Sequence, residues 1–304
     1  MKILVTDGMD KAAMEELTKL GYEVVKQFYE PDELGKALCD VDAVVVRSKT
    51  KVRANHIDEV VANNGKLKLV IRGGVGVDNI DVKYAEEKGI KVRNTPKASS
   101  DSVAELTLGH MLTLARFIGA ANVTMRKGEW NKKNYEGVEL AGKTLGLIGM
   151  GRISRSLAAK ASALGMKIVY TDIIGKIEGL SYEYCEKMED VLKKADFVSL
   201  HIPAAADGKP VIGAEQIAMM KDGAYLINIA RGGLVDEEAL CDALDSGKLA
   251  GAALDVFAKE PLANERVMHH DKISLTPHIG GSTKEAQSRI GMEIVDIVKD
   301  ILPL

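Results

Sequence analysis

The second half of the chain contains six short apolar runs, separated by stretches with helical periodicity. We expect strands at 144–149, 167–171, 197–200, 225–230, 252–257 and 273–276. Strands that alternate with helices run parallel, because each helix returns the chain to the same edge of the sheet. Six such strands predict a complete dinucleotide-binding domain of the doubly wound type.

The first part of the chain repeats this pattern less regularly. Residues 11–20 follow a helical pattern, and apolar runs predict further strands at 2–6, 23–25, 43–46 and 68–71. The stretch 94–101 is rich in Ser, Thr and Pro, which indicates a hinge. Ser102 with Glu105 predicts a capping box before a long apolar helix. We expect that helix to be buried between two layers or two subunits.

Composition limits the kinds of partner. Hydrophobic residues make up 46% and charged residues 28%, which is typical of a globular protein, and the net charge of −3 gives no general attraction for nucleic acid or membrane. An anion site therefore requires a local cluster of basic residues. The three cysteines are widely spaced and form no metal or redox motif, so we expect no metal. The apolar stretches are too short or too polar for a secretory signal or a membrane span, so we expect a cytoplasmic protein.

The strand at 144–149 runs directly into a helix through Gly149-Met-Gly151-Arg-Ile-Ser154. Gly149 would allow a tight turn, and Gly151 would let backbone amides approach a pyrophosphate at the helix N-terminus. The third small residue of such a motif is normally Gly or Ala, and Ser154 is small enough to replace it. Asp172 ends the next strand, where a carboxylate can accept hydrogen bonds from the ribose hydroxyls. Two isoleucines follow it instead of a cation for a 2′-phosphate, so we expect NAD rather than NADP.

A second glycine stretch, Arg72-Gly-Gly-Val-Gly-Val-Asp78, also follows an expected strand. Asn79 stands where a third small residue would be needed, and no acidic residue ends a matching next strand. The stretch therefore predicts a turn that presents backbone N–H groups, including those of Gly74 and Val75, to a small anion.

Three residues near strand ends suit the reduction of a 2-oxo acid, which requires a cation for the carboxylate and a proton donor for the carbonyl oxygen. Arg231 follows the strand at 225–230, and its guanidinium would clamp a carboxylate with two hydrogen bonds. Glu260 and His278 lie just beyond the last two expected strands. A carboxylate beside the imidazole would stabilise its charged form and fix its orientation. Taken singly, Arg231 could be a helix-capping arginine, Glu260 a surface acid and His278 a structural histidine.

The remaining histidines give weaker indications. His201 ends the strand at 197–200, and with Pro203 it would line the adenine or ribose side of the cleft. His56 and His110 lie in helical patterns and are expected to be structural. The adjacent pair at 269–270 faces opposite ways in most backbones, so we do not expect it to bind a metal.

Together these motifs resemble the D-isomer-specific 2-hydroxyacid dehydrogenase family over nearly the whole chain. The resemblance rests on four segments in the family's order: Gly149-Met-Gly151-Arg-Ile, Asn228-Ile-Ala-Arg231-Gly-Gly, Asp255-Val-Phe-Ala-Lys-Glu260-Pro and Thr276-Pro-His278-Ile-Gly-Gly. It implies an α/β protein with two doubly wound parallel-sheet domains, a Rossmann cofactor domain inserted into a flavodoxin-like substrate domain. Residues 1–94 and 277–304 would form the substrate domain, and residues 95–276 the dinucleotide-binding domain.

The resemblance also implies roles for individual residues. Arg231 would bind the substrate, His278 would be the acid/base with Glu260 as its partner, and Asp255 would contact the nicotinamide carboxamide. The full set expected to bind NAD is Gly149, Gly151, Arg152, Ile153, Asp172, His201, Pro203, Ala230, Asp255 and Gly280.

Two segments point to the substrate. Val46-Arg47-Ser-Lys49-Thr50 and Gly128-Glu-Trp-Asn-Lys132-Lys133 resemble segments of the family members that convert 3-phosphoglycerate to 3-phosphohydroxypyruvate in serine biosynthesis. In extended backbone Arg47 and Lys49 would point the same way, and by resemblance the loop with Lys132 would reach over from the other subunit of a homodimer. The candidate substrate contacts are Arg47, Ser48, Lys49, Gly74, Val75, Lys132 and Arg231. We expect a short form without regulatory domains.

Other interpretations remain open. The alternative for the basic side chains is that they are solvated surface cations: Arg47, Lys49, Lys132 and Lys133. A glyoxylate/hydroxypyruvate reductase shares the whole catalytic set and differs in needing no phosphate contact. An NAD-sensing corepressor or scaffold on the same fold is a hypothesis from another class, and it would need no intact acid/base pair.

Overall fold

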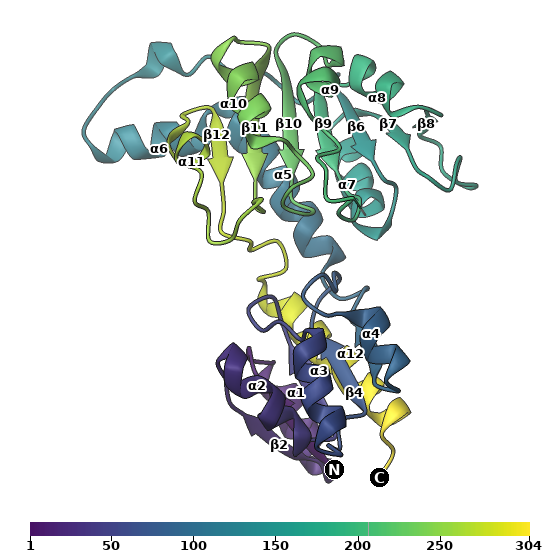
Figure 1. Ribbon diagram of the computed structural model, residues 1–304. Coiled ribbons are helices and arrows are strands. Elements are labelled where there is room, and N and C mark those ends of the chain that lie inside the picture. Colours follow the sequence, from purple (N-terminus) through teal and green to yellow (C-terminus); the bar gives the residue numbers. More distant parts are fainter. Residues whose placement is uncertain (206) are drawn as a thin grey trace. The chain divides into compact units, whose positions relative to one another are not determined.

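A computed structural model describes residues 1–205 and 207–304. The chain divides into two compact units, residues 1–99 with 281–304 (unit 1) and residues 100–280 (unit 2). Each unit is a parallel sheet with helices on its faces (Figure 1). The predicted fold class, two doubly wound α/β domains, is confirmed.

Unit 1 has a five-stranded sheet in the order β2-β1-β3-β4-β5. The chain winds in opposite directions from β1 and β3, so the topological switch point, where such sheets bind ligands, lies between the carboxyl ends of these two strands. The strands are β1 (Lys2–Val5), β2 (Glu23–Lys26), β3 (Ala43–Val46), β4 (Leu69–Arg72) and β5 (Lys91–Asn94). The helices are α1 (Lys11–Lys19), α2 (Pro31–Cys39), α3 (Ala54–Ala62), α4 (Val82–Glu87) and α12 (Lys284–Ile301).

The central strands of unit 1 are buried on both faces, which explains their continuous apolar sequences. On one face, Val45 and Ile71 pack with Leu17 of α1 and Ile294 of α12. On the other, Val44 and its neighbours pack with the apolar sides of α2 and α3. The sequence does not predict β5, because this edge strand alternates exposed Lys91 and Arg93 with buried Val92 and has no apolar run.

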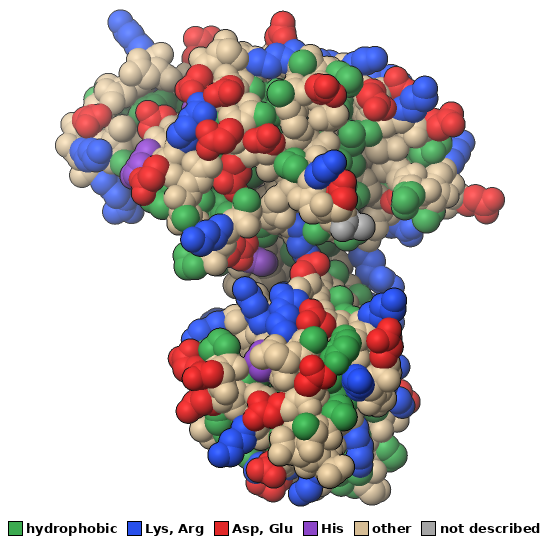
Figure 2. Space-filling model, in the orientation of Figure 1, with side chains coloured by type: hydrophobic (Ala, Val, Ile, Leu, Met, Phe, Trp, Pro, Cys, Tyr) green, Lys and Arg blue, Asp and Glu red, His purple; other side chains and the backbone are tan. Residues whose placement is uncertain are grey.

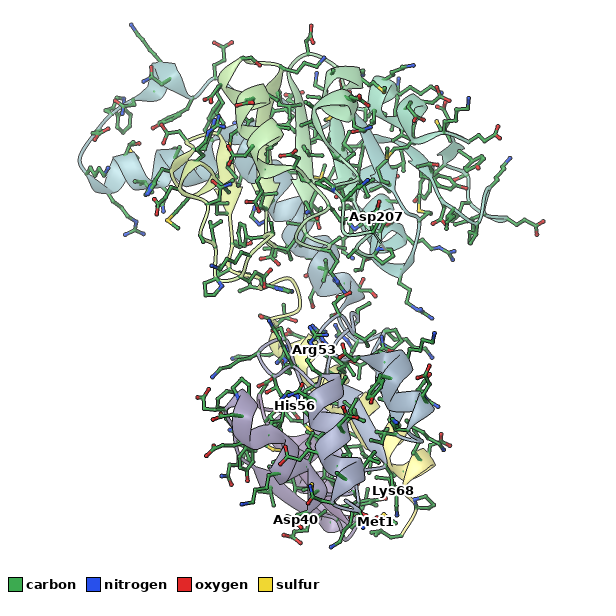
Figure 3. The ribbon with its side chains drawn as sticks, viewed as in Figure 1. Met1, Asp40, Arg53, His56, Lys68 and Asp207 are labelled. Atoms are coloured by element: carbon green, nitrogen blue, oxygen red, sulfur yellow. The ribbon has the colours of Figure 1, made fainter. Side chains whose placement is uncertain are left out.

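His56 has the structural role expected of it. It lies in the first turn of α3, close to Arg53 (Figure 3). Its Nδ1 accepts a hydrogen bond from the Arg53 amide at 3.1 Å, and its Nε2 lies 2.8 Å from the carbonyl oxygen of Pro31. The ring therefore joins the start of α3 to the start of α2.

Unit 2 has a seven-stranded sheet in the order β12-β11-β10-β9-β6-β7-β8, with its switch point between β6 and β9. The strands are β6 (Thr144–Ile148), β7 (Lys167–Thr171), β8 (Glu183–Tyr184), β9 (Phe197–Leu200), β10 (Ala224–Asn228), β11 (Leu249–Leu254) and β12 (Ile273–Leu275). Six of these match expected strands. The two-residue edge strand β8 is too short to give a pattern. The helices are α5 (Ser100–Arg116), α6 (Ile118–Arg126), α7 (Arg152–Ala163), α8 (Met188–Lys194), α9 (Ala214–Met219), α10 (Glu237–Asp245) and α11 (Glu265–His269), with a 3₁₀ turn η1 at Lys132–Asn134.

The long helix α5 begins earlier than the sequence predicted. It starts at Ser100, so Ser102 lies within the first turn and the predicted capping box is wrong. Val103, Ala104 and Met111 on its apolar side are buried in the core that α5 shares with α7 and the strands of unit 2. The helix is therefore buried within its own unit, where it covers one face of the sheet.

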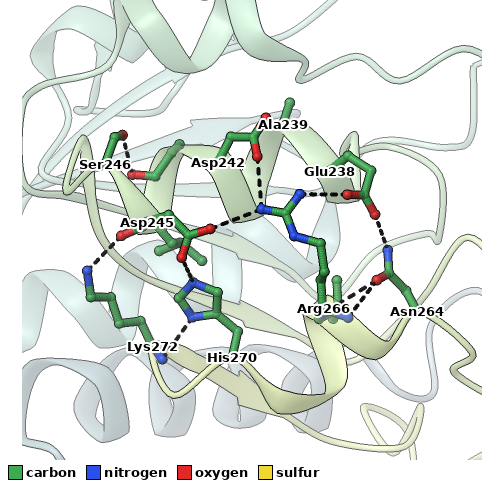
Figure 4. Close-up of polar contacts among 12 residues, drawn as sticks. Glu238, Ala239, Asp242, Asp245, Ser246, Asn264, Arg266, His270 and Lys272 are labelled. Atoms are coloured by element: carbon green, nitrogen blue, oxygen red, sulfur yellow. Dashed lines mark hydrogen bonds and ion pairs between the residues drawn. The ribbon is translucent and has the colours of Figure 1, made fainter.

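Charged side chains of both signs are interspersed over the visible face of each unit (Figure 2). On unit 2, Arg266 of α11 donates hydrogen bonds to Glu238, Asp242 and Asp245 of α10 at 2.7, 2.8 and 3.0 Å, which joins the two helices (Figure 4). His270 lies 3.4 Å from Asp245 in the same network. In the part of the chain that the structure describes, no helix has the length and apolar character needed to cross a membrane.

Candidate active site

The turn between β6 and α7 has the geometry of a dinucleotide loop. Gly149 has a φ of +88°, and a Cβ there would lie 2.6 Å from the carbonyl oxygen of His201, so only glycine fits. Gly151 is the N-cap of α7, and no other described atom lies within 4 Å of where its Cβ would be. The backbone is thus tight on its inner side and open at the helix N-terminus, which fits the approach of a pyrophosphate.

Ser154 takes the third small position of the motif. It is fully buried, and its hydroxyl donates a 2.6 Å hydrogen bond to the carbonyl oxygen of Gly149. The departure from Gly or Ala therefore adds a bond that ties the helix to the turn. Arg152 and Ile153 form the start of the same helix.

Asp172 lies beside this loop, directly after β7. Its carboxylate accepts from the amide of Met150 at 2.6 Å and from the amide of Ile174 at 3.1 Å. His201 follows β9 on the other side of the switch point, two residues before Pro203. Burial lowers the pKa of His201 to about 4, so the ring is neutral at physiological pH. Its Nε2 lies 2.9 Å from the Ser199 hydroxyl.

Glu260 and His278 are in direct contact. His278 Nδ1 lies 2.8 Å from Glu260 Oε2, and each side chain is 37% exposed. Burial opposes ionisation of Glu260, but the hydrogen bond and charge of His278, the Phe257 amide and the charge of Arg231 together hold the pKa of Glu260 below its usual range. The carboxylate is therefore charged at neutral pH and can stabilise an imidazolium.

Arg231 belongs to a loop that packs on the loop carrying Glu260. The side chain of Asn228, 1% exposed, donates to the Arg231 carbonyl oxygen at 2.8 Å and accepts from the Ala230 amide at 3.1 Å. A Cβ on Gly232 would lie 1.7 Å from the carbonyl oxygen of Phe257, so the two loops touch through a bare backbone. The structure thus brings the three predicted strand-end residues to neighbouring loops at one edge of the sheet.

Asp255, expected to contact the cofactor, holds the turn that contains His278. Its buried carboxylate accepts from the Thr276 hydroxyl at 2.6 Å and from the amides of Ile279 and Gly280, both at 2.8 Å. These donors lie on both sides of His278 in sequence. His278 itself has a φ of +54°, a conformation that residues other than glycine rarely adopt. Asp255 therefore stabilises an unusual turn.

In unit 1, residues 47–50 form a bend rather than the extended segment predicted. Asp7, which follows β1, accepts from the amides of Arg47 and Thr50 at 2.7 and 2.9 Å and from the Thr50 hydroxyl at 2.6 Å. The side-chain amide of Asn79 donates to the carbonyl oxygens of the same two residues. The bend containing Arg47 and Ser48 is thus fixed at the switch point of the sheet.

The two cations of the bend, Arg47 and Lys49, contact different neighbours. The guanidinium of Arg47 hydrogen-bonds to Gln287 of α12. The ammonium of Lys49 instead lies 3.6 Å from the ring centre of Phe28, in a cation–π contact. The side chains of Arg47 and Gln287 line a hollow of about 580 Å³, together with Asp10, Ser282, Thr283 and Lys284.

The other substrate candidates are placed as follows. The Gly73 amide donates to the carbonyl oxygen of Val46 and the Gly74 amide to that of Arg72, both at 2.9 Å. These two amides are therefore engaged within the protein rather than directed at an anion. An anion contact at this loop would fall to the later amides, from Val75 onwards. Lys132 lies in the exposed turn η1 of unit 2.

Several residues that hold the candidate site together are not predicted from the sequence. Asn228 stands out as a polar residue at the end of an apolar strand, a usable signal. Asp7 and Asn79 give no local signal, because their partners lie about 30 to 40 residues away.

Comparisons with known proteins show which proteins this chain is similar to. The family described as "D-isomer specific 2-hydroxyacid dehydrogenase, NAD binding domain" matches residues 108–280. A hydroxypyruvate reductase of Thermotoga maritima is 46% identical over 97% of this chain and 96% of its own length. A D-3-phosphoglycerate dehydrogenase of Methanocaldococcus jannaschii is 45% identical over 99% of this chain, which spans only 57% of that relative. A crystal structure of a protein from Thermus thermophilus has a TM-score of 0.90 at 34% identity, covering 99% of this chain and 97% of that one.

The doubly wound sheet of unit 2 and its glycine turn define an NAD-binding domain of the oxidoreductase type. The chain belongs to the D-isomer-specific 2-hydroxyacid dehydrogenase family.

Proposed function

We propose that this protein transfers a hydride between NAD and a small phosphorylated D-2-hydroxy acid, interconverting 3-phosphoglycerate and 3-phosphohydroxypyruvate. Its reaction type is that of an NAD-dependent D-2-hydroxyacid dehydrogenase, which the family supports. The observation that carries the proposal is the 2.8 Å contact between His278 and Glu260, whose loops neighbour the loop of Arg231.

The proposed chemistry follows from these three side chains. Because His278 Nδ1 is bonded to Glu260, its Nε2 is the nitrogen available to exchange a proton with the substrate oxygen. Glu260 would stabilise the imidazolium, and Arg231 would hold the substrate carboxylate. Bound NAD would supply or accept the hydride. A corepressor or scaffold would have no need of this ordered acid/base pair.

The phosphate part of the proposal rests on Arg47. This guanidinium lies at the switch point of unit 1. The hollow beside it is also lined by Lys284 at the N-terminus of the 18-residue helix α12. Two cations and the positive end of a helix dipole favour a dianion. Asp10 lines the same hollow, but its carboxylate caps α1 by accepting from the Ala13 amide.

Arg47→Ala tests this proposal against a matched control. Loss of a charge-assisted contact, worth roughly 1.5–3 kcal/mol, should raise KM for 3-phosphohydroxypyruvate by about 10- to 150-fold and change KM for hydroxypyruvate by less than about 3-fold. Lys49→Ala is the control, because that ammonium lies over Phe28 rather than beside Arg47. Equal effects of Arg47→Ala on both substrates would contradict the phosphate role.

Hydroxypyruvate reduction is the second candidate, because the Thermotoga maritima relative matches over almost its full length. A steady-state panel with NADH, comparing 3-phosphohydroxypyruvate, hydroxypyruvate, glyoxylate and pyruvate, separates the two. A higher kcat/KM for an unphosphorylated acid in the wild-type protein would replace our proposal with the reductase.

We propose further that the protein acts as a homodimer through the segment containing α6. All nine residues of α6 remain at least partly exposed, including Val123 and Met125 at 51% and 52%. Trp130 beyond it is 78% exposed. Exposed apolar side chains gathered in one segment indicate an interaction surface. Sedimentation should give a dimer for the wild type and a monomer for Val123→Glu with Met125→Glu, whereas a monomeric wild type would contradict the proposal.

A further inference from the structure

A buried hydrogen-bond chain connects α5 to the turn that carries His278. His110 of α5 is 4% exposed. Its Nδ1 lies 2.8 Å from the Ser274 hydroxyl, and its Nε2 lies 3.0 Å from the Thr276 hydroxyl. Thr276 in turn bonds to Asp255, the carboxylate that accepts the amides after His278.

The direction of each bond follows from the groups present. A carboxylate of Asp255 only accepts, so the Thr276 hydroxyl donates to it and its lone pair must accept from His110 Nε2–H. A neutral imidazole has one N–H, so Nδ1 accepts from the Ser274 hydroxyl. Burial lowers the pKa of His110, and the charge of Asp255 offsets only part of that effect, so the neutral ring is the stable form. One proton arrangement therefore satisfies the whole chain.

This hydrogen-bond chain reaches groups on both sides of His278 in sequence, the proposed acid/base residue. Thr276 precedes His278 by two residues, and the Ile279 and Gly280 amides follow it, so Asp255 clamps the turn across His278. The φ of +54° at His278 needs such support, because tertiary contacts must hold a non-glycine residue in this region. His110 orients the hydroxyl of Thr276 toward that clamp.

We propose that His110 is a positioning residue, which holds the His278 turn against Glu260 through Thr276 and Asp255. The inference deepens the proposed function and rests on it for its kinetic part only. A core histidine with a purely packing role would be replaceable by any side chain of similar size. The hydrogen-bond chain instead requires an N–H donor at the Nε2 position.

The test compares His110→Leu, which removes the donor, with His110→Gln, whose amide nitrogen can replace Nε2–H. Single-turnover hydride transfer with NADH should slow by roughly 10- to 100-fold in His110→Leu, and His110→Gln should recover most of this loss, because small displacements of a reacting group cost that much. The affinity for NADH should change by less than about 3-fold in both. Met111→Ala, a buried change on the same helix, is the control for destabilisation alone.

Hydrogen exchange provides a readout independent of activity. The Ile279 and Gly280 amides should exchange at least roughly 10-fold faster in His110→Leu than in Met111→Ala of comparable thermal stability. Thr276→Val should have the same effect. Combining it with His110→Leu should raise the exchange rate little further, because both changes interrupt the same hydrogen-bond chain. If the wild type reduces none of the 2-oxo acids but exchange responds in this way, the proposed function fails and the positioning role stands.

Three results would overturn the inference. The first is unchanged amide exchange at Ile279 and Gly280 in His110→Leu. The second is a hydride-transfer rate in His110→Gln no higher than in His110→Leu. The third is equal slowing of hydride transfer by Met111→Ala.

Discussion

Gly232→Ala should lower the activity by about 100-fold without adding any polar or charged group. The new Cβ would lie 1.7 Å from the Phe257 carbonyl oxygen and 2.3 Å from its carbon, and both are backbone atoms that cannot rotate away. The Arg231 loop must therefore move from the Glu260 loop by about 1.3 Å, from 1.7 Å to at least 3.0 Å. A displacement of about 1 Å at a catalytic group costs on the order of 100-fold, or about 2.7 kcal/mol of transition-state stabilisation.

The assay is kcat/KM for 2-oxo acid reduction, followed by loss of NADH absorbance, with thermal unfolding measured in parallel. Gly233→Asn is the matched control, because no other described atom lies within 4 Å of a Cβ at this position and asparagine tolerates its φ of +80°. We expect the control to stay within about 5-fold of the wild type, because asparagine adopts the left-handed region more readily than other non-glycine residues. A folded Gly232→Ala protein with kcat/KM within about 3-fold of the wild type would refute the argument that this contact sets the geometry of Arg231 and Glu260.

The remaining predictions concern the proposed acid/base pair, the cofactor and pH. His278→Asn should lower kcat by roughly 10²- to 10⁴-fold while NADH binding, measured by fluorescence titration, survives; near-normal turnover would exclude His278 as the acid/base. Glu260→Gln should move the loss of reductive activity to lower pH, because the imidazolium loses its neighbouring negative charge; the pKa of Glu260 lies below its usual range, so this carboxylate does not itself titrate near neutrality. The kcat/KM with NADH should exceed that with NADPH by at least about 10-fold, and Asp172→Ala should narrow the difference, because the carboxylate beside the glycine turn repels a 2′-phosphate; equal use of both cofactors by the wild type would contradict this placement. The pKa of His201 falls from 6.5 to about 4 on folding, so the unfolded chain takes up a proton first as the pH drops, and stability is lost between these values. That loss amounts to at most about 3.4 kcal/mol, and His201→Asn should flatten the pH dependence of urea unfolding over this range; an unchanged slope would show that His201 is not the cause.

Much of this architecture is encoded in local sequence. Strands buried on both faces, such as β3, β9 and β10, need apolar side chains at successive positions, so they are visible as runs. The glycine turn after β6 is also local, because a φ of +88° at Gly149 requires a residue without a Cβ. Residues at the carboxyl ends of parallel strands reach one edge of the sheet, which is why the sequence alone groups Arg231, Glu260 and His278.

Other features depend on groups that are distant in sequence. The edge strand β5 exists because β4 pairs with it, although its own residues are largely polar. The bend at residues 47–50 is set by Asp7, some 40 residues away, so a prediction of extended backbone from the adjoining strand was wrong.

The role of His110 shows the same limit most clearly. Its sequence context indicates only a buried helix position, and its partners Ser274 and Thr276 lie 164 and 166 residues further along the chain. Apolar periodicity records whether a side chain is buried, because burial follows from the face of one element. The partner of a buried polar atom is decided by how several elements pack together, and only the tertiary structure contains that information.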